Sequence, residues 1–375
     1  AYETPGLPAD EWAVLGTSGE QRGRRFTTVE IRPLQLDPVS GEARVLTSVE
    51  LRVDLVGGDW DATEARIERY ASPDFERLAR RVFLDPHGAD SKGVLPLPLG
   101  YLIIAGDSLF DAMIPFAEMK TRLGYDVLMV RASEVPGGSS KTSIQAFVED
   151  TYHNAPVAPT FLLLVGDTGQ IPEWTGDHSW SASDLYYTTM DGSGDWMPDL
   201  LVGRFSSSSE ADIARMVTKT VDYTMWTLGS GDEWIKKATF MASTDNHWIS
   251  EGTHDYCIDT WLGPDGFDAT RRYYDDGAST GQVLGDINAG LSQLTYSGHG
   301  YEQGWSDGPP MDSGDVQGLG NVGKLPVVQS YACLTGAFDT SCYGEAWLKA
   351  SNGAVAFWGS STYSYWDEDD IMQRA

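Results

Sequence analysis

The feature that most constrains the fold is a series of short, almost purely apolar segments that recurs from Tyr101 onward. In sequence order the segments are YLIIAG, YDVLMVR, TFLLLVG, DLLVGRF, KATFMAS, LSQLTYSG, PVVQSYAC and AVAFWGS. Segments of this kind are typical of parallel strands that are covered on both faces. Between them lie helical patterns at Leu109–Leu123 and Glu210–Tyr223, the second opened by Ser209 and Asp212 as a capping box. The alternation predicts an α/β domain with a mostly parallel sheet and helices on both faces, whose ligands bind beyond the carboxyl ends of the strands.

The first 60 or so residues follow a different pattern. Polar and β-branched residues alternate over Phe26–Leu34 and Arg44–Val56, and the turn Asp37–Gly41 separates the two runs. This predicts a β-hairpin. A Pro-rich stretch at Lys92–Gly100 is a suitable linker. We therefore predict a small β-rich segment with its linker over residues 1–92, and the α/β domain over residues 93–375.

Charge excludes several classes of partner. The chain holds 26 Lys and Arg against 55 Asp and Glu, a formal net charge of −29. Such a surface repels nucleic acid and anionic lipid. No apolar run approaches the roughly 20 residues of a membrane helix, so we expect no membrane insertion. The chain starts at Ala1 rather than Met, which suggests a removed leader or pro-segment, or a trimmed sequence.

Two potentially reactive side chains follow predicted strands. His299 ends the run LSQLTYSGHG, and Cys333 ends PVVQSYAC. Strands of one parallel sheet end at the same edge, so the two side chains are expected to meet there. A thiol needs an adjacent base to become a nucleophilic thiolate, and His is the usual one. Gly298 and Gly300 permit positive φ and let a substrate backbone come close, while the amides of Gly300 and Cys333 are candidates for an oxyanion hole.

A structural interpretation of these residues is about equally plausible on chemistry alone. Cys is among the most buried residue types, and a His between glycines is commonly a turn residue. The three cysteines, Cys257, Cys333 and Cys342, allow at most one disulfide bond. We expect Cys257 and Cys342 to be structural. The five other histidines show no metal-like spacing, so no zinc site is predicted.

The motifs TYSGHG and ACLTGAF resemble the His and Cys motifs of the gingipain-type cysteine peptidases, a family of the caspase-like clan. Three further stretches resemble landmarks of that family in the same order: FLLLVGDTGQIP, SDLYY and PDLLVGRFSSSSEAD. The resemblance runs from about Tyr101 to the end, and the segment before it resembles the end of the family's pro-domain. It implies a caspase-like α/β fold, a zymogen, and roles for Cys333 as nucleophile and His299 as base.

The resemblance also implies an acidic residue that orients the imidazole. Asp199 stands at that position, where the best-known members carry Glu. Upstream, Asp191, Ser193 and Asp195 place oxygen ligands at every second position, which suits Ca²⁺. Calcium stabilises members of the family, although an acidic solvated turn is as good an interpretation.

Gingipain-like enzymes cleave after basic residues, which implies acidic groups at the substrate pocket. Asp212 is a candidate, and Trp366 resembles the aromatic residue that lines or covers that pocket. Helix capping by Asp212 and an exposed acidic helix start after Trp366 are the competing interpretations. The chain ends early for the family, and Arg374 would suit a processing cut.

These observations predict a secreted or cell-surface cysteine endopeptidase with a preference for basic P1 residues. It needs no cofactor for chemistry, with Ca²⁺ as a structural ion, and its partners are polypeptide substrates and its own pro-domain. Two alternatives stay open. One is a sortase-like transpeptidase on the same scaffold. The other is a secreted calcium-binding module in which the Cys–His pair is inert.

Overall fold

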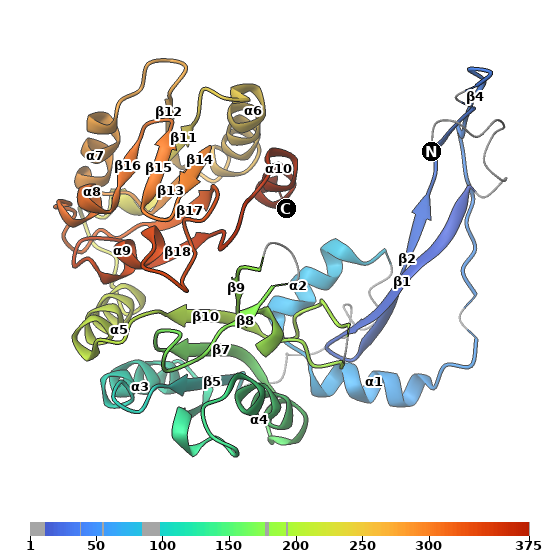
Figure 1. Cartoon of the computed structure of the whole chain (residues 1–375), viewed down its shortest axis with the longest axis horizontal. Helices are drawn as coiled ribbons and strands as arrows, with labels where there is room; N and C mark the ends of the chain where they lie inside the picture. The colour runs from blue at the N-terminus through green and yellow to red at the C-terminus, as the bar shows by residue number, and fades with distance from the viewer. Residues whose placement is uncertain are drawn as a thin grey trace. The chain divides into compact units, whose positions relative to one another are not determined.

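The computed structural model describes residues 12–37, 39–54, 56–84, 98–176, 180–192 and 194–374. The chain divides into two compact units (Figure 1). The first comprises Ala1–Leu97 together with Thr189–Asp199, and the second comprises Pro98–Thr188 with Leu200–Ala375. The predicted boundary between residues 92 and 93 lies outside the described residues, so that division stays a prediction.

The first unit contains a long antiparallel hairpin that the sequence interpretation misplaced. Strand β1 (Ala13–Gln21) pairs with β2 (Arg24–Ile31). The turn between them has Arg22 at φ 46° and Gly23 at φ 80°, the backbone that a two-residue hairpin turn requires.

The predicted turn at residues 37–41 does join two strands, but these are short. Strand β3 (Leu34–Leu36) pairs with β4 (Ala43–Val45), and residues 46–54 form no strand. Residues 26–31 pair instead with β1, because that segment offers the longer complementary partner. Helices α1 (Trp60–Arg69) and α2 (Pro73–Val82) complete the described part of this unit.

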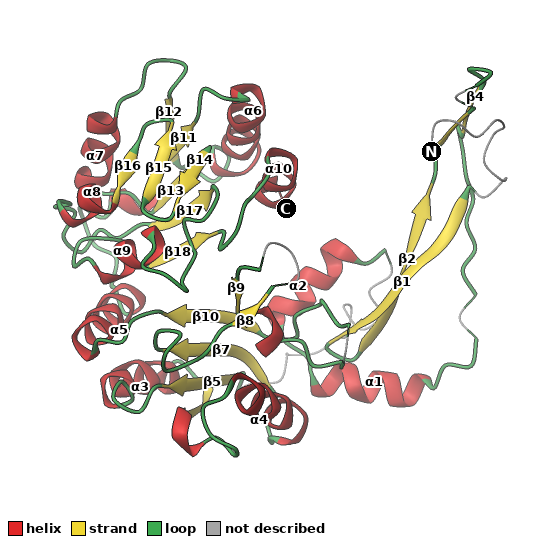
Figure 2. Ribbon diagram, viewed as in Figure 1, coloured by secondary structure: helices red, strands yellow, loops and turns green. Residues whose placement is uncertain are grey.

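The second unit is built on two parallel sheets flanked by helices (Figure 2). In the four-stranded sheet the strand order is β10-β7-β5-β6. Its strands are β5 (Gly100–Ala105), β6 (Asp126–Arg131), β7 (Pro159–Val165) and β10 (Leu201–Phe205). Its helices are η1 (Asp111–Met113), α3 (Ile114–Arg122), α4 (Lys141–Asn154) and α5 (Glu210–Thr224). Both sequence-predicted helices are thus confirmed.

The five-stranded sheet has the order β12-β11-β13-β17-β18. Its strands are β11 (Lys237–Ala242), β12 (Asp268–Tyr273), β13 (Gln293–Ser297), β17 (Val327–Tyr331) and β18 (Ala356–Gly359). Its helices are α6 (His247–Cys257), α7 (Thr280–Ala289), α8 (Ser313–Gln317), α9 (Tyr343–Lys349) and α10 (Trp366–Arg374). Strand β12 was missed because its sequence, DATRRY, is mostly polar, as befits an edge strand.

Alternate residues of β11 show how both faces of this sheet are covered. Met241 packs with Val283 of α7 on one face, and Phe240 packs with Cys257 of α6 on the other. Side chains alternate across a strand, so both faces must be apolar when helices cover both. The predicted α/β class, mostly parallel with helices on both faces, is confirmed.

A buried lysine connects helices of the two sheets within this unit. The Nζ of Lys219 in α5 directs its three N–H donors at four backbone carbonyl oxygens, all within hydrogen-bond distance at the end of α9 and just beyond it, those of Trp347, Leu348, Ala350 and Ala354. Four acceptors around one ammonium group satisfy a charge that would otherwise be costly to bury. Within the described residues, every helix is too short or too polar for a transmembrane span.

Candidate active site

His299 and Cys333 follow neighbouring strands. Strands β13 and β17 are hydrogen-bonded parallel partners, with Ser297 opposite Tyr331 in the register. His299 begins the short strand β14 (His299–Tyr301), and Cys333 lies two residues beyond the end of β17. Both residues therefore stand at the carboxyl edge of one sheet, as the sequence predicts.

The glycines beside His299 serve close packing and not positive φ. Neither Gly298 nor Gly300 is among the residues with φ above zero, so the conformational freedom that glycine permits is not used at these two positions. A Cβ on Gly298 would lie 2.5 Å from the Tyr296 Oη, and one on Gly300 would lie 2.8 Å from the Cys333 carbonyl oxygen. Contacts under 3.0 Å are essentially never seen for a Cβ. The absence of side chains thus lets the loop after β13 contact the loop after β17.

The imidazole of His299 is held by a carboxylate that the sequence interpretation did not find. The Nε2 of His299 lies 3.0 Å from the Oδ2 of Asp245, and the two side chains are 50% and 56% exposed. Asp245 follows β11, which neighbours β13 in the sheet. Asp307 accepts hydrogen bonds from the Thr244 hydroxyl and the Asp245 amide, and so fixes this loop. Because Nε2 faces a carboxylate, Nδ1 is the nitrogen left to accept a proton.

The thiol of Cys333 is partly buried under the segment that follows β18. Its Sγ lies 3.5 Å from the amide nitrogen of Ser364 and 3.6 Å from the Ser364 carbonyl oxygen. The next residue, Leu334, has φ 61°, a conformation rarely adopted by residues other than glycine and often found at functional sites. The indole of Trp366 meets the His299 ring edge-on, with ring centroids 5.6 Å apart. One segment therefore contacts both candidate catalytic side chains.

Asp199 belongs to the first unit and is 1% exposed. Its Oδ1 accepts a hydrogen bond of 2.6 Å from the Arg22 amide, and its Oδ2 accepts one of 3.1 Å from the Met190 amide. Burial raises the pKa of this carboxyl group to about 7, and the nearby charge of Asp191 adds to the rise. The described hydrogen bonds of the Asp199 carboxylate are thus to backbone amides, so its orienting role stays a prediction.

Two of the three predicted calcium ligands, Asp191 and Asp195, lie close together in the structure, and Asp199 joins them. Carboxylate oxygens of Asp191, Asp195 and Asp199 lie within 4.8 Å of one another. Ser193 lies outside the described residues. Asp199 was assigned a different role from the sequence, because nothing local shows that the chain returns to this turn four residues after Asp195.

The two predicted substrate residues occupy different settings. Asp212 stands in the first turn of α5 and is engaged by an ion pair of 2.8 Å with Arg215 and by a 3.1 Å hydrogen bond from the Ser207 hydroxyl. Only half of the predicted capping box forms, since the Ser209 hydroxyl accepts from the Asp212 amide at 3.4 Å. Trp366, in contrast, lies against His299. Substrate contact by either residue stays a prediction.

Two of the sequence landmarks have a clear structural role. Asp184 of SDLYY and Arg204 of VGRF form a two-point ion pair, at 2.7 and 2.8 Å. The same guanidinium donates to the carbonyl oxygens of Gly166 and Ile171. This buried pair joins the loops at the carboxyl edge of the four-stranded sheet.

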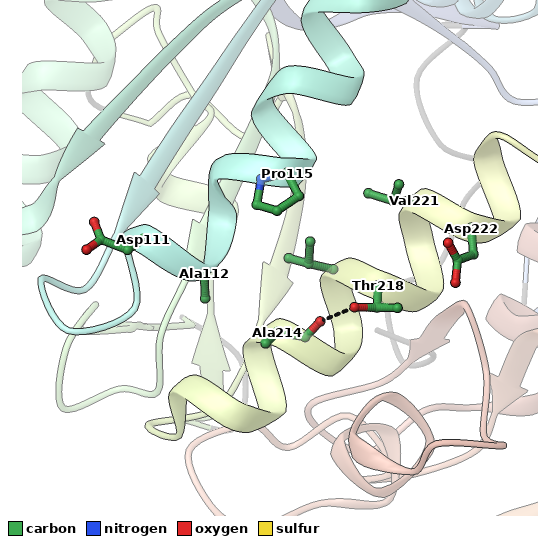
Figure 3. A pocket seen from close by; sticks show the side chains of 8 residues that line it. Asp111, Ala112, Pro115, Ala214, Thr218, Val221 and Asp222 are labelled. Carbon is green, nitrogen blue, oxygen red and sulfur yellow. Dashed lines mark hydrogen bonds between the residues drawn. The ribbon is translucent and has the colours of Figure 1, made fainter.

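A surface pocket lies away from His299 and Cys333, between η1, α3 and α5 (Figure 3). It measures about 280 Å³, and its walls include Pro115, Val217 and Val221 with Asp111 and Asp222 at its edges. Neither His299 nor Cys333 lines it. We assign this pocket no role in catalysis. All three cysteines lie in the described residues, and none is paired in a disulfide bond.

Comparison with known proteins gives a consistent answer. Residues 95–375 match the model of peptidase family C25. Lys-gingipain of Porphyromonas gingivalis is 29% identical over 378 residues, which cover 98% of this chain but 22% of that protein. Gingipain R2 of the same organism is 25% identical over 369 residues, covering 95% of this chain and 50% of the relative. This chain therefore spans about a fifth to a half of the length of these relatives.

Solved structures agree with the family match. The crystal structure of the Arg-specific cysteine proteinase gingipain R (RGPB) aligns with a TM-score of 0.65 at 26% identity, covering 73% of this chain and 65% of that one. The complex of Porphyromonas gingivalis RgpB pro- and mature domains aligns with a TM-score of 0.65 at 25% identity, covering 74% and 67%. The chain belongs to peptidase family C25 and carries a gingipain-like cysteine peptidase domain.

Proposed function

We propose that this chain is a cysteine endopeptidase in which Cys333 is the nucleophile and His299 the base. The observation that carries the proposal is the placement of both residues at the ends of hydrogen-bonded parallel strands, with their loops in contact through Gly300. The Nδ1 of His299 takes the thiol proton, and the thiolate attacks the scissile carbonyl carbon. The imidazolium then protonates the leaving amine, and water hydrolyses the thioester.

Asp245 is proposed as the residue that orients the imidazole. Its contact with Nε2 keeps the proton on that nitrogen and leaves Nδ1 to act as base. The family position for this role is Asp199, which remains the competing candidate. The amides of Gly300 and Cys333 are proposed to bind the oxyanion. The irregular pairing of β14 with β15 (Gly304–Asp307) between His299 and Gly300 supports this assignment, because bulges of this kind re-aim backbone groups beside active sites.

The substrate class proposed is polypeptide with a basic P1 residue. Its support is the names of the relatives, Lys-gingipain and an Arg-specific gingipain R, together with the acidic residues around the proposed site. Asp245 and Asp307 flank His299, and Asp367 to Asp370 follow Trp366. Asp212 is proposed as a further acidic contact for the P1 side chain, and Trp366 as a wall of its pocket.

The N-terminal segment is proposed to be a retained pro-domain of a secreted or cell-surface zymogen. The tip of its long hairpin is hydrogen-bonded to a segment within residues 95–375, the part of the chain that matches the family. Gln21 donates to the Pro198 carbonyl oxygen, and Arg22 donates to both the carboxylate and the carbonyl oxygen of Asp199. A segment held in this way is not free to adjust to substrate. Release of the hairpin by a proteolytic cut is therefore expected to increase turnover.

Ca²⁺ is proposed as a structural ion held by Asp191, Asp195 and Asp199. A set of carboxylate oxygens suits this hard cation, and its charge would offset the raised pKa of the buried Asp199. Added Ca²⁺ is expected to raise the melting temperature of the wild-type chain but not of Asp191→Asn. Equal shifts in the two proteins would contradict the site.

The test of the enzymatic proposal compares peptides with Arg, Lys or Asp at P1, using wild type, Cys333→Ala and His299→Ala. Hydrolysis of the Arg or Lys peptide by wild type alone, with alkylation at Cys333, supports the proposal. No turnover and no labelling of Cys333 would defeat it. Product masses measured with an added amine separate hydrolysis from transfer, and so test the transpeptidase alternative.

A further inference from the structure

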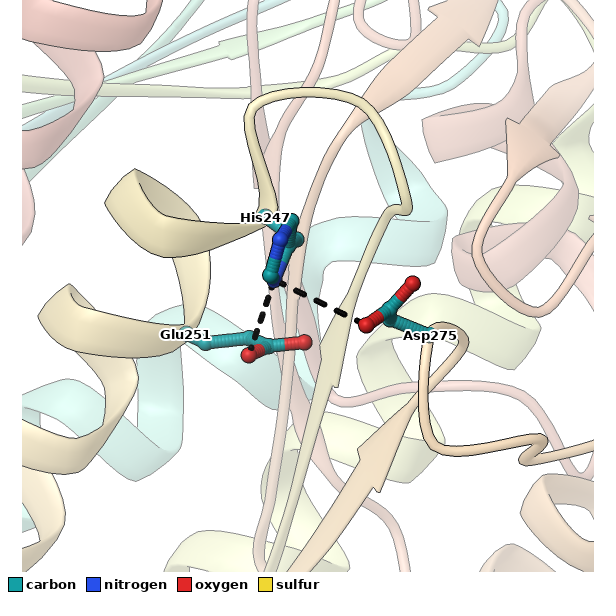
Figure 4. A group of neighbouring side chains, drawn as sticks. All are labelled: His247, Glu251 and Asp275. Carbon is teal, nitrogen blue, oxygen red and sulfur yellow. Dashed lines mark hydrogen bonds and ion pairs between the residues drawn. The ribbon is translucent and has the colours of Figure 1, made fainter.

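Three side chains of the types that ligate metal ions converge at the start of α6, outside the proposed active site (Figure 4). His247 is the first residue of that helix, Glu251 lies one turn later on the same face, and Asp275 follows β12. The Nδ1 of His247 lies 3.3 Å from a Glu251 carboxylate oxygen and 3.9 Å from one of Asp275. One ligand atom from each residue lies within 4.8 Å of the other two.

These spacings match the edges of a tetrahedral metal site. With metal–nitrogen and metal–oxygen bonds of about 2.0–2.2 Å, ligand atoms in a tetrahedron are separated by roughly 3.3–3.6 Å. The observed 3.3 and 3.9 Å therefore need only a small side-chain adjustment to share one ion.

A second, independent observation points to a missing ligand. The Oε1 of Glu251 is buried and has no hydrogen-bond partner among the described residues. A buried carboxylate oxygen without a partner is rare in folded proteins and indicates a ligand such as an ion or a water molecule. An ordinary ion pair between His247 and Glu251 would account for their 3.3 Å contact but leaves this oxygen unsatisfied.

We propose that His247, Glu251 and Asp275 bind a divalent transition-metal ion, with Zn²⁺ as the representative. The imidazole nitrogen distinguishes this site from the all-carboxylate group around Asp199, because nitrogen ligands favour Zn²⁺ over Ca²⁺. Two carboxylates and one neutral imidazole leave the ion's charge balanced. The 54% exposure of Asp275 leaves one side of the site accessible to a water ligand.

The site lies beside the loop that carries Asp245. Strand β11 ends at Ala242, and α6 begins at His247, so only four residues separate them. Asn246, between Asp245 and His247, has φ 47°, a conformation that costs energy for a residue other than glycine. An ion that ties α6 to the end of β12 would hold this loop in place. The resulting effect on catalysis rests on the proposed function, whereas metal binding itself does not.

The test measures Zn²⁺ binding by equilibrium dialysis on the full chain carrying Cys333→Ala. This background removes the thiol that would bind Zn²⁺ together with His299, and excess Ca²⁺ occupies the group around Asp199. One equivalent of Zn²⁺ is expected. His247→Ala and Asp275→Asn are each expected to weaken binding at least about tenfold. Substituting Co²⁺ gives a visible spectrum that reports a tetrahedral site, and this spectrum should vanish in His247→Ala.

His153→Ala is the matched control, since it removes a histidine of α4 that belongs to neither metal group. It should bind Zn²⁺ as its parent does. Far-ultraviolet circular dichroism identifies any variant that fails to fold, and Glu251→Gln then replaces it as the test variant. Absence of binding by the parent, or equal binding by parent and site variants, would overturn the proposal. Peptide hydrolysis by wild type in chelator would then leave the proposed peptidase function standing.

Discussion

Replacement of Asp245 tests whether the carboxylate in contact with His299 orients the catalytic base. The substitution Asp245→Asn keeps the size of the side chain and removes its charge, and Asp245→Ala removes the contact as well. Both partners are about half exposed, at 50% for His299 and 56% for Asp245. Water can therefore replace much of what the carboxylate supplies.

The exposure sets the expected magnitude. Exposed ion pairs contribute about 0.2–1 kcal/mol. If all of that free energy is realised in the transition state, kcat/KM falls by about 1.4- to fivefold. A buried orienting carboxylate can supply about 10⁴-fold in kcat. We therefore expect Asp245→Asn to lose less than about fivefold and Asp245→Ala slightly more.

The assay is hydrolysis of a peptide with a basic P1 residue, with active enzyme counted by alkylation of Cys333. The pH dependence of kcat/KM is recorded for each variant alongside the rate. A loss of about a thousandfold would refute the reasoning from exposure, and would mean that the pair becomes buried when substrate binds. If neither Asp245 variant changes the rate or the pH profile, Asp245 does not orient the imidazole, and Asp199 becomes the preferred candidate for that role.

Three further predictions concern stability. Burial lowers the pKa of His254 from 6.5 to about 4, so the folded chain binds fewer protons than the unfolded chain between these pH values. The free energy of unfolding should therefore fall by up to roughly 3 kcal/mol as the pH drops from 6.5 to 4. In denaturant titrations, His254→Gln should reduce this dependence of the unfolding free energy on pH. Gly300→Ala places a Cβ 2.8 Å from the Ala332 Cβ and should lower the free energy of unfolding by about 1–3 kcal/mol. Gly285→Ala, in α7 with no neighbouring atom within 4 Å of its Cβ, should raise it by about 0.5–1 kcal/mol. Equal melting temperatures of the two variants would contradict the packing argument. Lys219→Met removes a donor shared by four carbonyl oxygens, of which those of Trp347 and Ala350 keep an amide donor. It should destabilise the chain by about 1–3 kcal/mol for each carbonyl oxygen left unsatisfied, which chemical denaturation would measure.

The apolar segments were sufficient to predict the parallel strands because a strand buried on both faces must be apolar along its whole length. The same rule explains the failure at β12, an edge strand in which Arg271 and Arg272 pair with carboxylates. The prediction of the N-terminal hairpin was wrong for another reason. Its pairing depends on the turn at Arg22 and Gly23, and the positive φ of Arg22 is invisible in a sequence.

The candidate site shows a similar division between local and distant information. His299 and Cys333 could be found because each carries its signal in its own strand. Asp245 could not, because its role depends on the adjacency of β11 to β13, which brings together residues 54 positions apart. The pair His247 and Glu251 did carry a readable four-residue helical spacing, but the third partner, Asp275, comes from the end of β12, the strand that was missed.

The order of strands at the carboxyl edge therefore decides what this chain can do. Strand β12 leads to Asp275, β11 to Asp245, β13 to His299, and β17 to Cys333. Because neighbouring strands lie side by side, the proposed metal site, orienting acid, base and nucleophile follow one another along a single edge. A change in the β11–α6 loop is then expected to act on two functions at once. Insertion of one glycine after Asn246 should weaken both Zn²⁺ binding and the contact between Asp245 and His299, whereas the same insertion after Gly266, in the loop before β12, should affect neither. Equal effects of the two insertions on metal binding and on hydrolysis would show that the edge does not couple them.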